Sequence, residues 1–357
     1  MRVLVPVAAA AALAAAAGAA AQEVSWTVPE FPDPLRFSSL PLEPSEAAAP
    51  APGTVLLRFG SAYFNVWQRT WHTATIHKEF RLQGQPLQAW EVQTLAERHP
   101  HDQFYHLDLE GTRSDLAATV GLGRGWALTA CIPWIEIGAP HWDGISDKFH
   151  GVFGLSDVER QTFPRGQSNV VIRGAHGMLV RLDGLEGSGV GDVALALTGP
   201  AGSWLGGQQR WVAAVEAPTG ERDTLRGSGG WDAGLRMFSR WGDDRRGASL
   251  GLGYTWLDPS GSFLGLQRDD MWHLLGEGHV PLGARLVARL AARFDASPLA
   301  SYTDSEVGRA SFYWMLGLRG ALADGAWWSF DAGENYGSQG EVPDFSFHLQ
   351  VGTRIGR

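Results

Sequence analysis

The fold is decided by residues 231–256, which read WDAGLRMFSRWGDDRRGASLGLGYTW. In the first half, the charged residues fall on one face of an expected strand, namely Asp232, Arg236 and Arg240. In the second half, Leu250, Leu252, Tyr254 and Trp256 share an apolar face, opposite Ser, Gly and Thr residues. Such alternation, with aromatic residues at the end of the apolar face, is typical of a strand that meets lipid on one side and a polar lumen on the other.

The same pattern recurs along the chain and predicts about twelve strands. We expect them at 54–66, 104–122, 126–137, 189–199, 209–217, 230–241, 246–257, 271–281, 285–295, 308–319, 325–334 and 344–355. Their connections alternate between long loops and short turns, as periplasmic turns and extracellular loops do in bacterial barrels. The sequence therefore predicts an all-β fold, a transmembrane antiparallel up-and-down β-barrel of about 12 strands with long extracellular loops.

A soluble β-sandwich is the alternative fold, because its strands also alternate. Sandwich strands are commonly about five or six residues long, and nothing requires tryptophan at both ends of their apolar face. Composition supports the barrel and limits the partners: the 357 residues include 16 Trp and a single cysteine, Cys131. One cysteine excludes a disulfide scaffold, and a net charge of −9 without a basic block argues against nucleic acid as a partner.

The sequence divides into three segments. Residues 1–21 combine Arg2, an apolar stretch and Ala19-Ala20-Ala21, the pattern of a cleaved signal peptide. Residues 22–53 are rich in proline and are expected to form a periplasmic N-terminal segment with little regular structure. Residues 54–357 are the expected barrel, and we predict that it lies in the cell outer membrane.

Four short motifs resemble a known family. They are Phe149-His150-Gly151-Val152-Phe153-Gly154-Leu155-Ser156, Gly189-Val190-Gly191-Asp192, Ala217-Pro218-Thr219-Gly220 and Gly227-Ser228-Gly229. They resemble an uncharacterised family of Gram-negative outer-membrane proteins, catalogued as a domain of unknown function, from about Pro32 to the C-terminus. The likeness is weaker to outer-membrane proteins of aromatic-compound (phenol meta-pathway) degradation. The resemblance implies an outer-membrane barrel with a transport role, and it carries no catalytic residues to transfer. Outer-membrane lipid and the barrel assembly machinery are the expected partners.

No enzymatic motif stands out in the sequence. Gly202-Ser203 follows Ala201, which breaks the Gly-x-Ser-x-Gly pattern of a nucleophile elbow. We predict that the protein is not an enzyme and uses no cofactor, although residues from distant strands can still assemble a catalytic group. The histidines of the first external loops, among them His99, His101 and His106 near Asp102, are too loosely spaced to define a metal site. We assign no metal, and leave open whether these histidines bind one.

The charged residues expected on the lumen face form the candidate pore lining. They are Asp232, Arg236, Arg240, His273, Glu277, His279, Arg285, Arg289 and Arg293. With a tight turn centred on Gly283, Glu277 is expected directly across from Arg289. Two interpretations remain open. The charges create a transverse field in an open channel, or they are paired and fill a closed interior.

The loop at 138–188 is the expected gate. Trp142, Phe149, Phe153 and Leu155 make it too apolar for a freely solvated loop, so it needs a surface to pack on. It is expected to fold into the barrel mouth as a constriction or to pack on the outer rim.

The sequence therefore favours an outer-membrane channel or carrier for passive uptake of small molecules. Aromatic or hydrophobic solutes are the first candidates, on the family likeness and the apolar loop. The alternative is a closed-lumen structural or lipid-acting barrel without transport activity.

Overall fold

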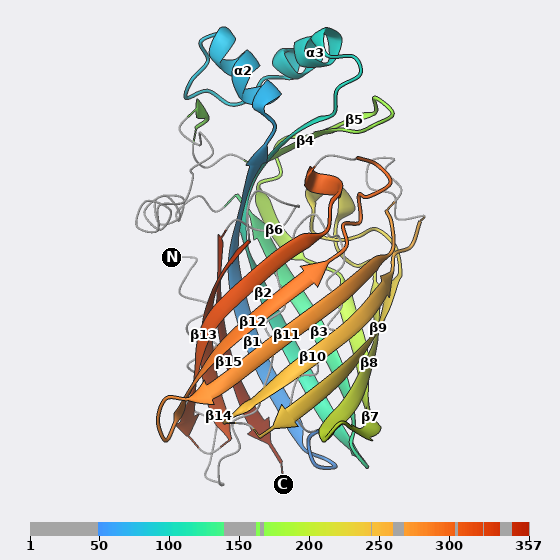
Figure 1. Cartoon of the computed structure of the whole chain (residues 1–357), viewed down its shortest axis with the longest axis vertical. Helices are drawn as coiled ribbons and strands as arrows, with labels where there is room; N and C mark the ends of the chain where they lie inside the picture. Colours follow the sequence, from blue (N-terminus) through green and yellow to red (C-terminus); the bar gives the residue numbers. More distant parts are fainter. Residues whose placement is uncertain are drawn as a thin grey trace.

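The computed structural model describes residues 49–138, 162–164, 168–243, 245–259, 268–303, 306–323, 325–335 and 345–356. Within them, twelve strands close into one antiparallel barrel (Figure 1). These are β1 Val55–Arg69, β2 Phe104–Gly123, β3 Trp126–Ile137, β7 Val193–Trp204, β8 Gly207–Ala217, β9 Asp232–Gly242, β10 Gly247–Trp256, β11 Met271–Pro281, β12 Leu286–Asp295, β13 Ser311–Ala323, β14 Ala326–Asn335 and β15 Phe345–Ile355. The predicted up-and-down barrel is confirmed.

Closure comes from the pairing of the first and last strands. β1 pairs with β15 from Val55↔Ile355 to Asn65↔Phe345, and every other barrel strand pairs with the strands before and after it in the chain order given above. A closed barrel leaves no strand edge with unpaired backbone groups, which is the condition for a sheet to stand in lipid. The short turns and the C-terminus lie at the lower end in Figure 1, and the long connections lie at the upper end. We call these the turn end and the loop end.

One expected strand is confirmed over its length, and one expected turn is corrected. β2 runs through Gly111, as the strand expected at 104–122 requires; a Cβ at this position would lie 2.4 Å from the Glu136 carbonyl oxygen. The glycine therefore permits close packing against β3. The turn expected over 200–208 is much shorter, because β7 and β8 stay paired to Trp204↔Gly207. Leu205 and Gly206 both have positive φ, as two-residue hairpin turns of type I′ require.

The loop end carries additional structure that the sequence did not predict. The connection from β1 to β2 was expected as a loop, but it contains two helices, α2 Trp71–Glu79 and α3 Ala89–Arg98. The α3 helix starts at a capping box in which Gln88 and Glu91 satisfy each other's backbone N–H groups. Of all the helices in the described ranges, none is long and apolar enough to cross a membrane.

Among the described residues, further short strands and 3-10 helices lie at the loop end. β4 Asn169–Arg173 pairs with the start of β2, β5 Leu179–Leu182 pairs with β4, and β6 Gly187–Val190 pairs with the end of β3. The 3-10 helices are η2 Arg222–Thr224 and η3 Glu306–Gly308. The expected gate loop 138–188 is thus partly strand. Its apolar residues Trp142, Phe149, Phe153 and Leu155 fall outside the described residues, so their gating role stays a prediction.

Candidate functional site

The outer face of the barrel is apolar. Leucines from seven strands point away from the lumen and are between 46% and 63% exposed, namely Leu116, Leu195, Leu235, Leu252, Leu290, Leu316 and Leu349. Tryptophans flank this band, with Trp134, Trp231, Trp256 and Trp272 toward the loop end and Trp126, Trp204, Trp211, Trp241 and Trp328 toward the turn end. An apolar band between two aromatic rows is the surface of a membrane-spanning barrel. The opposite face of each strand therefore lines the candidate site, the lumen.

Paired charges fill one wall of the lumen, formed by β11 to β14. Arg289 of β12 and Asp331 of β14 form a two-pronged ion pair, and one of its contacts joins Nε to Oδ1 at 2.5 Å. Their side chains are 2% and 0% exposed. Arg319 of β13 lies over the Trp327 ring, 4.4 Å from its centroid. A buried pair of this kind is costly to break, because either partner alone is a desolvated charge.

A second polar chain crosses the same wall nearer the loop end. The Thr255 hydroxyl lies 2.8 Å from His273 Nε2, and His273 Nδ1 lies 2.5 Å from the Asp295 carboxylate. This hydroxyl, imidazole and carboxylate follow the order of a hydrolytic triad. However, Arg293 also binds Asp295 at 2.6 Å, and Thr255, His273 and Asp295 are only 2%, 4% and 1% exposed. This row of hydrogen-bonded side chains is therefore inaccessible to solutes, and it links β10, β11 and β12.

The structure places most of the predicted lining residues inside the barrel. Asp232, Arg236, His273, Glu277, His279 and Arg289 are buried on the lumen face, and Arg240 and Arg293 are half-buried there. Arg236 fits against β10 because position 253 is glycine; a Cβ at Gly253 would lie 2.7 Å from the Arg236 Nε.

The predicted register of the β11–β12 turn was wrong. Pro281 pairs with Val287, so His279 rather than Glu277 lies across from Arg289, and Glu277 faces Ala291. The turn is one residue off the expected centre because Leu282 N donates to the Leu286 carbonyl oxygen at 3.0 Å. Arg285 consequently precedes β12 and is exposed, with its carbonyl accepting a bond from Ala321 N. It does not continue the arginine ladder inside the barrel.

The lumen also has an apolar patch and a recess. Ala196, Val212, Ala214, Phe238 and Leu275 form a buried cluster on the inner face of β7, β8, β9 and β11. The recess lies on the opposite side of the barrel, along β1, β2 and β15. It is lined by Arg58, Gly60, Ser61, Ala62, Asp115, His348 and Gln350. Small residues on β1 leave this space open, whereas the wall from β11 to β14 is filled by side chains.

A separate apolar core lies across the loop end of the lumen, and we call it the mouth core. Its buried members come from six parts of the chain and are Val66, Tyr105, Leu107, Leu109, Ile137, Val170, Ile172, Val180, Leu182, Leu185, Leu225, Leu299, Tyr302 and Val307. They bring the β4–β5 hairpin together with β1, β2 and β3 on one side and with the loops after β8 and β12 on the other. The mouth is therefore covered by apolar side chains.

Hydrogen bonds hold the β12–β13 loop on the mouth core. The Tyr302 hydroxyl donates to the Ile172 carbonyl oxygen at 3.2 Å, and Ala175 N donates to the Tyr302 carbonyl oxygen at 3.0 Å. Thr303 Oγ1 donates to the Gln103 side chain at 2.6 Å. Burial raises the pKa of Tyr302, so its hydroxyl remains a donor at neutral pH.

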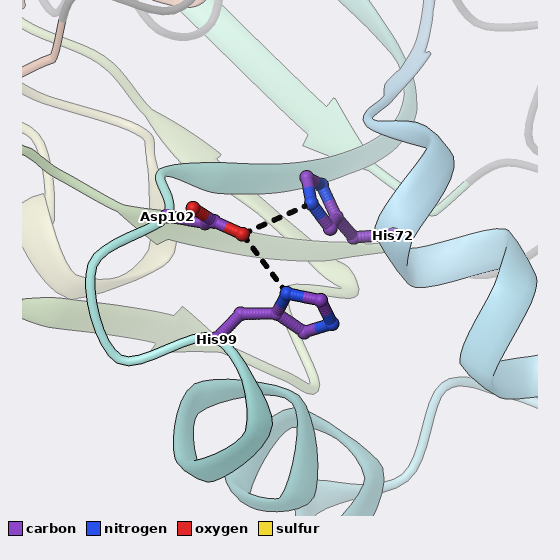
Figure 2. A group of neighbouring side chains, drawn as sticks. All are labelled: His72, His99 and Asp102. Atoms are coloured by element: carbon purple, nitrogen blue, oxygen red, sulfur yellow. Dashed lines mark hydrogen bonds and ion pairs between the residues drawn. The ribbon is translucent and has the colours of Figure 1, made fainter.

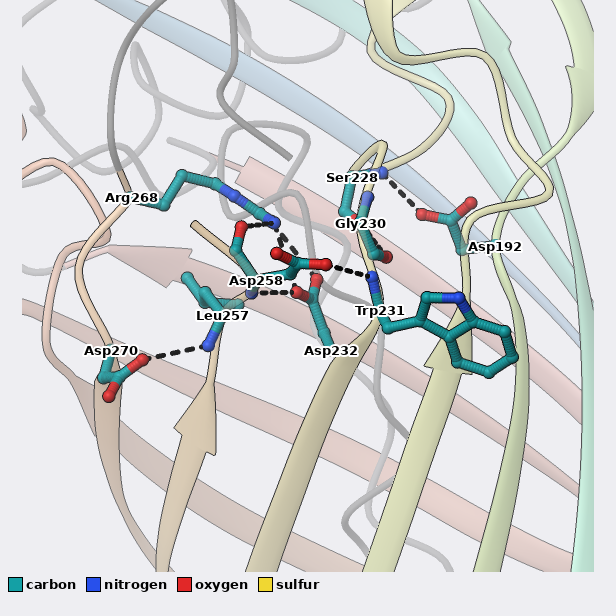
Figure 3. A network of polar contacts seen from close by, with 9 residues as sticks. All are labelled: Asp192, Ser228, Gly230, Trp231, Asp232, Leu257, Asp258, Arg268 and Asp270. Atoms are coloured by element: carbon teal, nitrogen blue, oxygen red, sulfur yellow. Dashed lines mark hydrogen bonds and ion pairs between the residues drawn. The ribbon is translucent and has the colours of Figure 1, made fainter. Parts of the chain in front are cut away.

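Two aspartates fasten the loops at the rim (Figure 3). Asp192 accepts hydrogen bonds from Ser228 N at 2.5 Å and from Gly220 N at 2.7 Å. Thr219 Oγ1 donates to the Gly191 carbonyl oxygen at 2.8 Å. Three of the motifs singled out in the sequence therefore form one joint between the loop ends of β7, β8 and β9. Asp192, Thr219 and Gly220 from these motifs form its hydrogen bonds.

The second fastening is a buried ion pair beside it. Arg268 reaches both Asp232 oxygens at 3.1 and 3.2 Å, and both side chains are fully buried. Asp258 N donates to the same Asp232 carboxylate at 2.9 Å, and Trp231 N donates to Asp258 (Figure 3). Asp232, predicted as a pore-lining charge, therefore holds the β10–β11 loop in place.

The histidines that lie close together in the sequence do not form one group in the structure. His106 is 1% exposed and packs against Trp67 and Phe163, on the side of β2 covered by the helices. His99 and Asp102 instead meet His72, which is far from them in the sequence. Sequence proximity could not identify this group, because helix packing determines which side chains converge.

The closed barrel, with an apolar outer face and a polar lumen face, defines the class of protein: an outer-membrane-type β-barrel. A family model described as a protein of unknown function (DUF3187) matches residues 39–355. The chain belongs to this family, which confirms the resemblance drawn from its motifs. No curated protein matches the sequence.

Several solved structures resemble the chain at low sequence identity. The COG4313 outer membrane channel from Pseudomonas putida F1 is similar with a TM-score of 0.52 and 11% identity, over 87% of this chain and 99% of that one. The NanC porin gives a TM-score of 0.42 at 9% identity, over 84% and 100% of the two chains. The toluene transporter TbuX from Ralstonia pickettii gives 0.35 at 9%, over 86% and 89%. The first of these likenesses shows a common fold.

Proposed function

We propose that the protein is an outer-membrane channel for the passive uptake of small apolar or aromatic molecules, and not an enzyme. One observation carries the proposal: a closed barrel whose loop-end mouth is covered by an apolar core. A water-filled polar mouth admits ions and sugars, whereas burying a charge in an apolar core is strongly unfavourable. A small apolar molecule incurs no such cost and gains contact with the core.

Passage requires the mouth core to separate for a short time. Strand β5 is the part best suited to move, because among the described residues its ladder partner is β4 alone, at the edge of the sheet. Below it, the recess beside Gly60 and Ala62 is the path we assign, since the adjoining wall from β11 to β14 is filled by ion pairs. The lining of this path includes the polar or charged residues Arg58, Asp115, His348 and Gln350, so a solute with a hydroxyl group is also accommodated.

Uptake by intact cells tests the proposal, because the lipopolysaccharide leaflet is the barrier that apolar solutes need a channel to cross. We expect Gram-negative cells that carry the protein to accumulate radiolabelled toluene faster than cells without it, and to take up a labelled disaccharide no faster. Ile172→Ala removes apolar contacts from the mouth core at a cost of about 2–5 kcal/mol and should raise the toluene rate further. Leu179→Ala is the matched control, because Leu179 is 37% exposed on the same hairpin.

Heat-modifiable migration on gels monitors that both variants remain folded. Equal toluene uptake with and without the folded wild-type protein would refute the channel. That outcome supports the alternative, a closed barrel with a structural role in the envelope.

A further inference from the structure

Three potential metal ligands converge at the outer tip of the molecule (Figure 2). His72 lies in the first turn of α2, His99 follows the last residue of α3, and Asp102 lies in the segment that leads into β2. One ligand atom from each residue lies within 4.8 Å of the other two. The group is partly open, with the His72, His99 and Asp102 side chains 12%, 34% and 49% exposed.

The distances between these atoms suit one small cation. Asp102 Oδ2 lies 2.9 Å from His99 Nδ1 and 3.4 Å from His72 Nε2. Tetrahedral ligands at zinc bond lengths of about 2.0–2.1 Å stand about 3.4 Å from each other. Asp102 therefore lies within about half an ångström of this spacing from each histidine. The two histidine nitrogens lie within 4.8 Å of each other and approach the spacing by rotation of their side chains.

The backbone around the group is held in place before any ion binds. Arg173 of β4 donates to the carbonyl oxygens of His99 at 2.5 Å and Pro100 at 2.7 Å. Thr70 N donates to the Tyr105 carbonyl oxygen at 3.0 Å, which fixes the start of α2 on β2. The Trp71 ring stacks on the His72 ring with centroids 4.0 Å apart. Such preorganisation reduces the entropy lost when an ion binds.

The chemistry of the donor set also suits a cation. Asp102 supplies a carboxylate beside the two imidazoles, and imidazoles bind metals in their neutral form.

We propose that His72, His99 and Asp102 bind one divalent transition metal ion, with Zn²⁺ as the ion that fits this donor set best. Two imidazoles and one carboxylate form the ligand set of open zinc sites, in which a water molecule completes the coordination. Calcium and magnesium prefer sites made of oxygen atoms alone. The bound ion links the start of α2 to the end of α3 and to the segment before β2.

Calorimetric titration of the purified full-length protein in detergent with ZnCl₂ at pH 7.5 tests the site. We expect one zinc ion per chain, with the affinity lowered about 100-fold or more in His72→Ala and in His99→Ala, since each removes one of three ligands. Asp102→Asn keeps an oxygen that accepts a bond from His99, but removes the charge, and should also weaken binding. His176→Ala is the matched control, because His176 is an exposed loop histidine outside the group.

A second measurement separates binding at this group from binding by other histidines. Arg98 is exposed at the end of α3, next to the proposed ligands. Zinc should slow trypsin cleavage after Arg98 in the wild type and in His176→Ala, and should leave it unchanged in His99→Ala. Absence of zinc binding, or unaltered affinity and protection in the His72→Ala/His99→Ala double variant, would overturn the proposal.

Discussion

The barrel wall and the mouth core are built by different rules. In the wall, contacts join strands that follow one another in the chain, as from β11 to β14. Successive residues of a strand point to opposite faces, so alternate positions face the lumen and the others face lipid. In the mouth core, Val66 and Val307 belong to the same apolar cluster, although they are separated by most of the barrel sequence. Alternation along one strand therefore determines the wall. The mouth depends on which loops reach one another after the barrel has closed.

The largest expected effect comes from breaking the wall at Arg289. Arg289→Gln leaves Asp331 as a buried charge without its main partner, which costs about 3–5 kcal/mol. The matched control is Arg285→Gln, because Arg285 is exposed in the adjacent turn. Surface changes of this kind stay within about 0.5 kcal/mol. Urea unfolding in lipid vesicles measures both.

A double variant distinguishes a structural pair from a pore charge. Arg289→Met with Asp331→Leu removes both charges and should restore most of the lost stability. Similar stability of Arg285→Gln and Arg289→Gln would show that the wall is hydrated and open, contrary to the packing of the pair.

The next effect in size tests which face of the wall meets lipid. Leu252 is 63% exposed on the outer face of β10, where an arginine near the bilayer centre costs about 2–4 kcal/mol. Ser249 lies on the lumen face of the same strand, across from Glu277 and Arg240. Leu252→Arg should lower the folded fraction in vesicles, measured by heat-modifiable migration, while Ser249→Arg should not. Equal loss in both variants would mean that both faces are buried in protein.

The same contrast explains what the sequence could predict. The lumen side of Arg236, Glu277 and Arg289 followed from period-two alternation, because a strand in a barrel has only two sides. The position of Arg285 and the pairing of Glu277 did not follow, since one hydrogen bond within the turn shifts the register. Register depends on turn geometry that residue types only partly specify.

The loop-end sites were beyond sequence reasoning for a different reason. His99, His101, Asp102 and His106 are close in the chain, yet His106 points into the packing around Trp67 and Phe163. The neighbour of His99 in space is His72, which is brought there by the packing of two helices that the sequence pattern did not predict. The Gly-x-Gly-Asp and Pro-Thr-Gly motifs were recognised, but their shared role required the contact between Asp192 and Gly220 to be seen.

The smallest expected effect concerns that joint, where wall and loops meet. Asp192 is 2% exposed, and its carboxylate accepts bonds from Gly220 N and Ser228 N. Asp192→Asn keeps the size and one acceptor oxygen but loses the charge and turns the other oxygen into a donor that faces an N–H group. We expect a loss of about 1–3 kcal/mol, the range for an unsatisfied buried hydrogen-bonding group. Asp183→Asn is the control, because Asp183 is 54% exposed in its surface pair with Arg181, and such pairs contribute about 0–1 kcal/mol.

Hydrogen exchange of the Gly220 and Ser228 amides shows where in the structure the stability is lost. Faster exchange there, with unchanged exchange in β11 to β14, means that the joint opens independently of the wall. Equal acceleration in both regions would mean that the barrel and its loops unfold as one unit, and would remove the distinction between them.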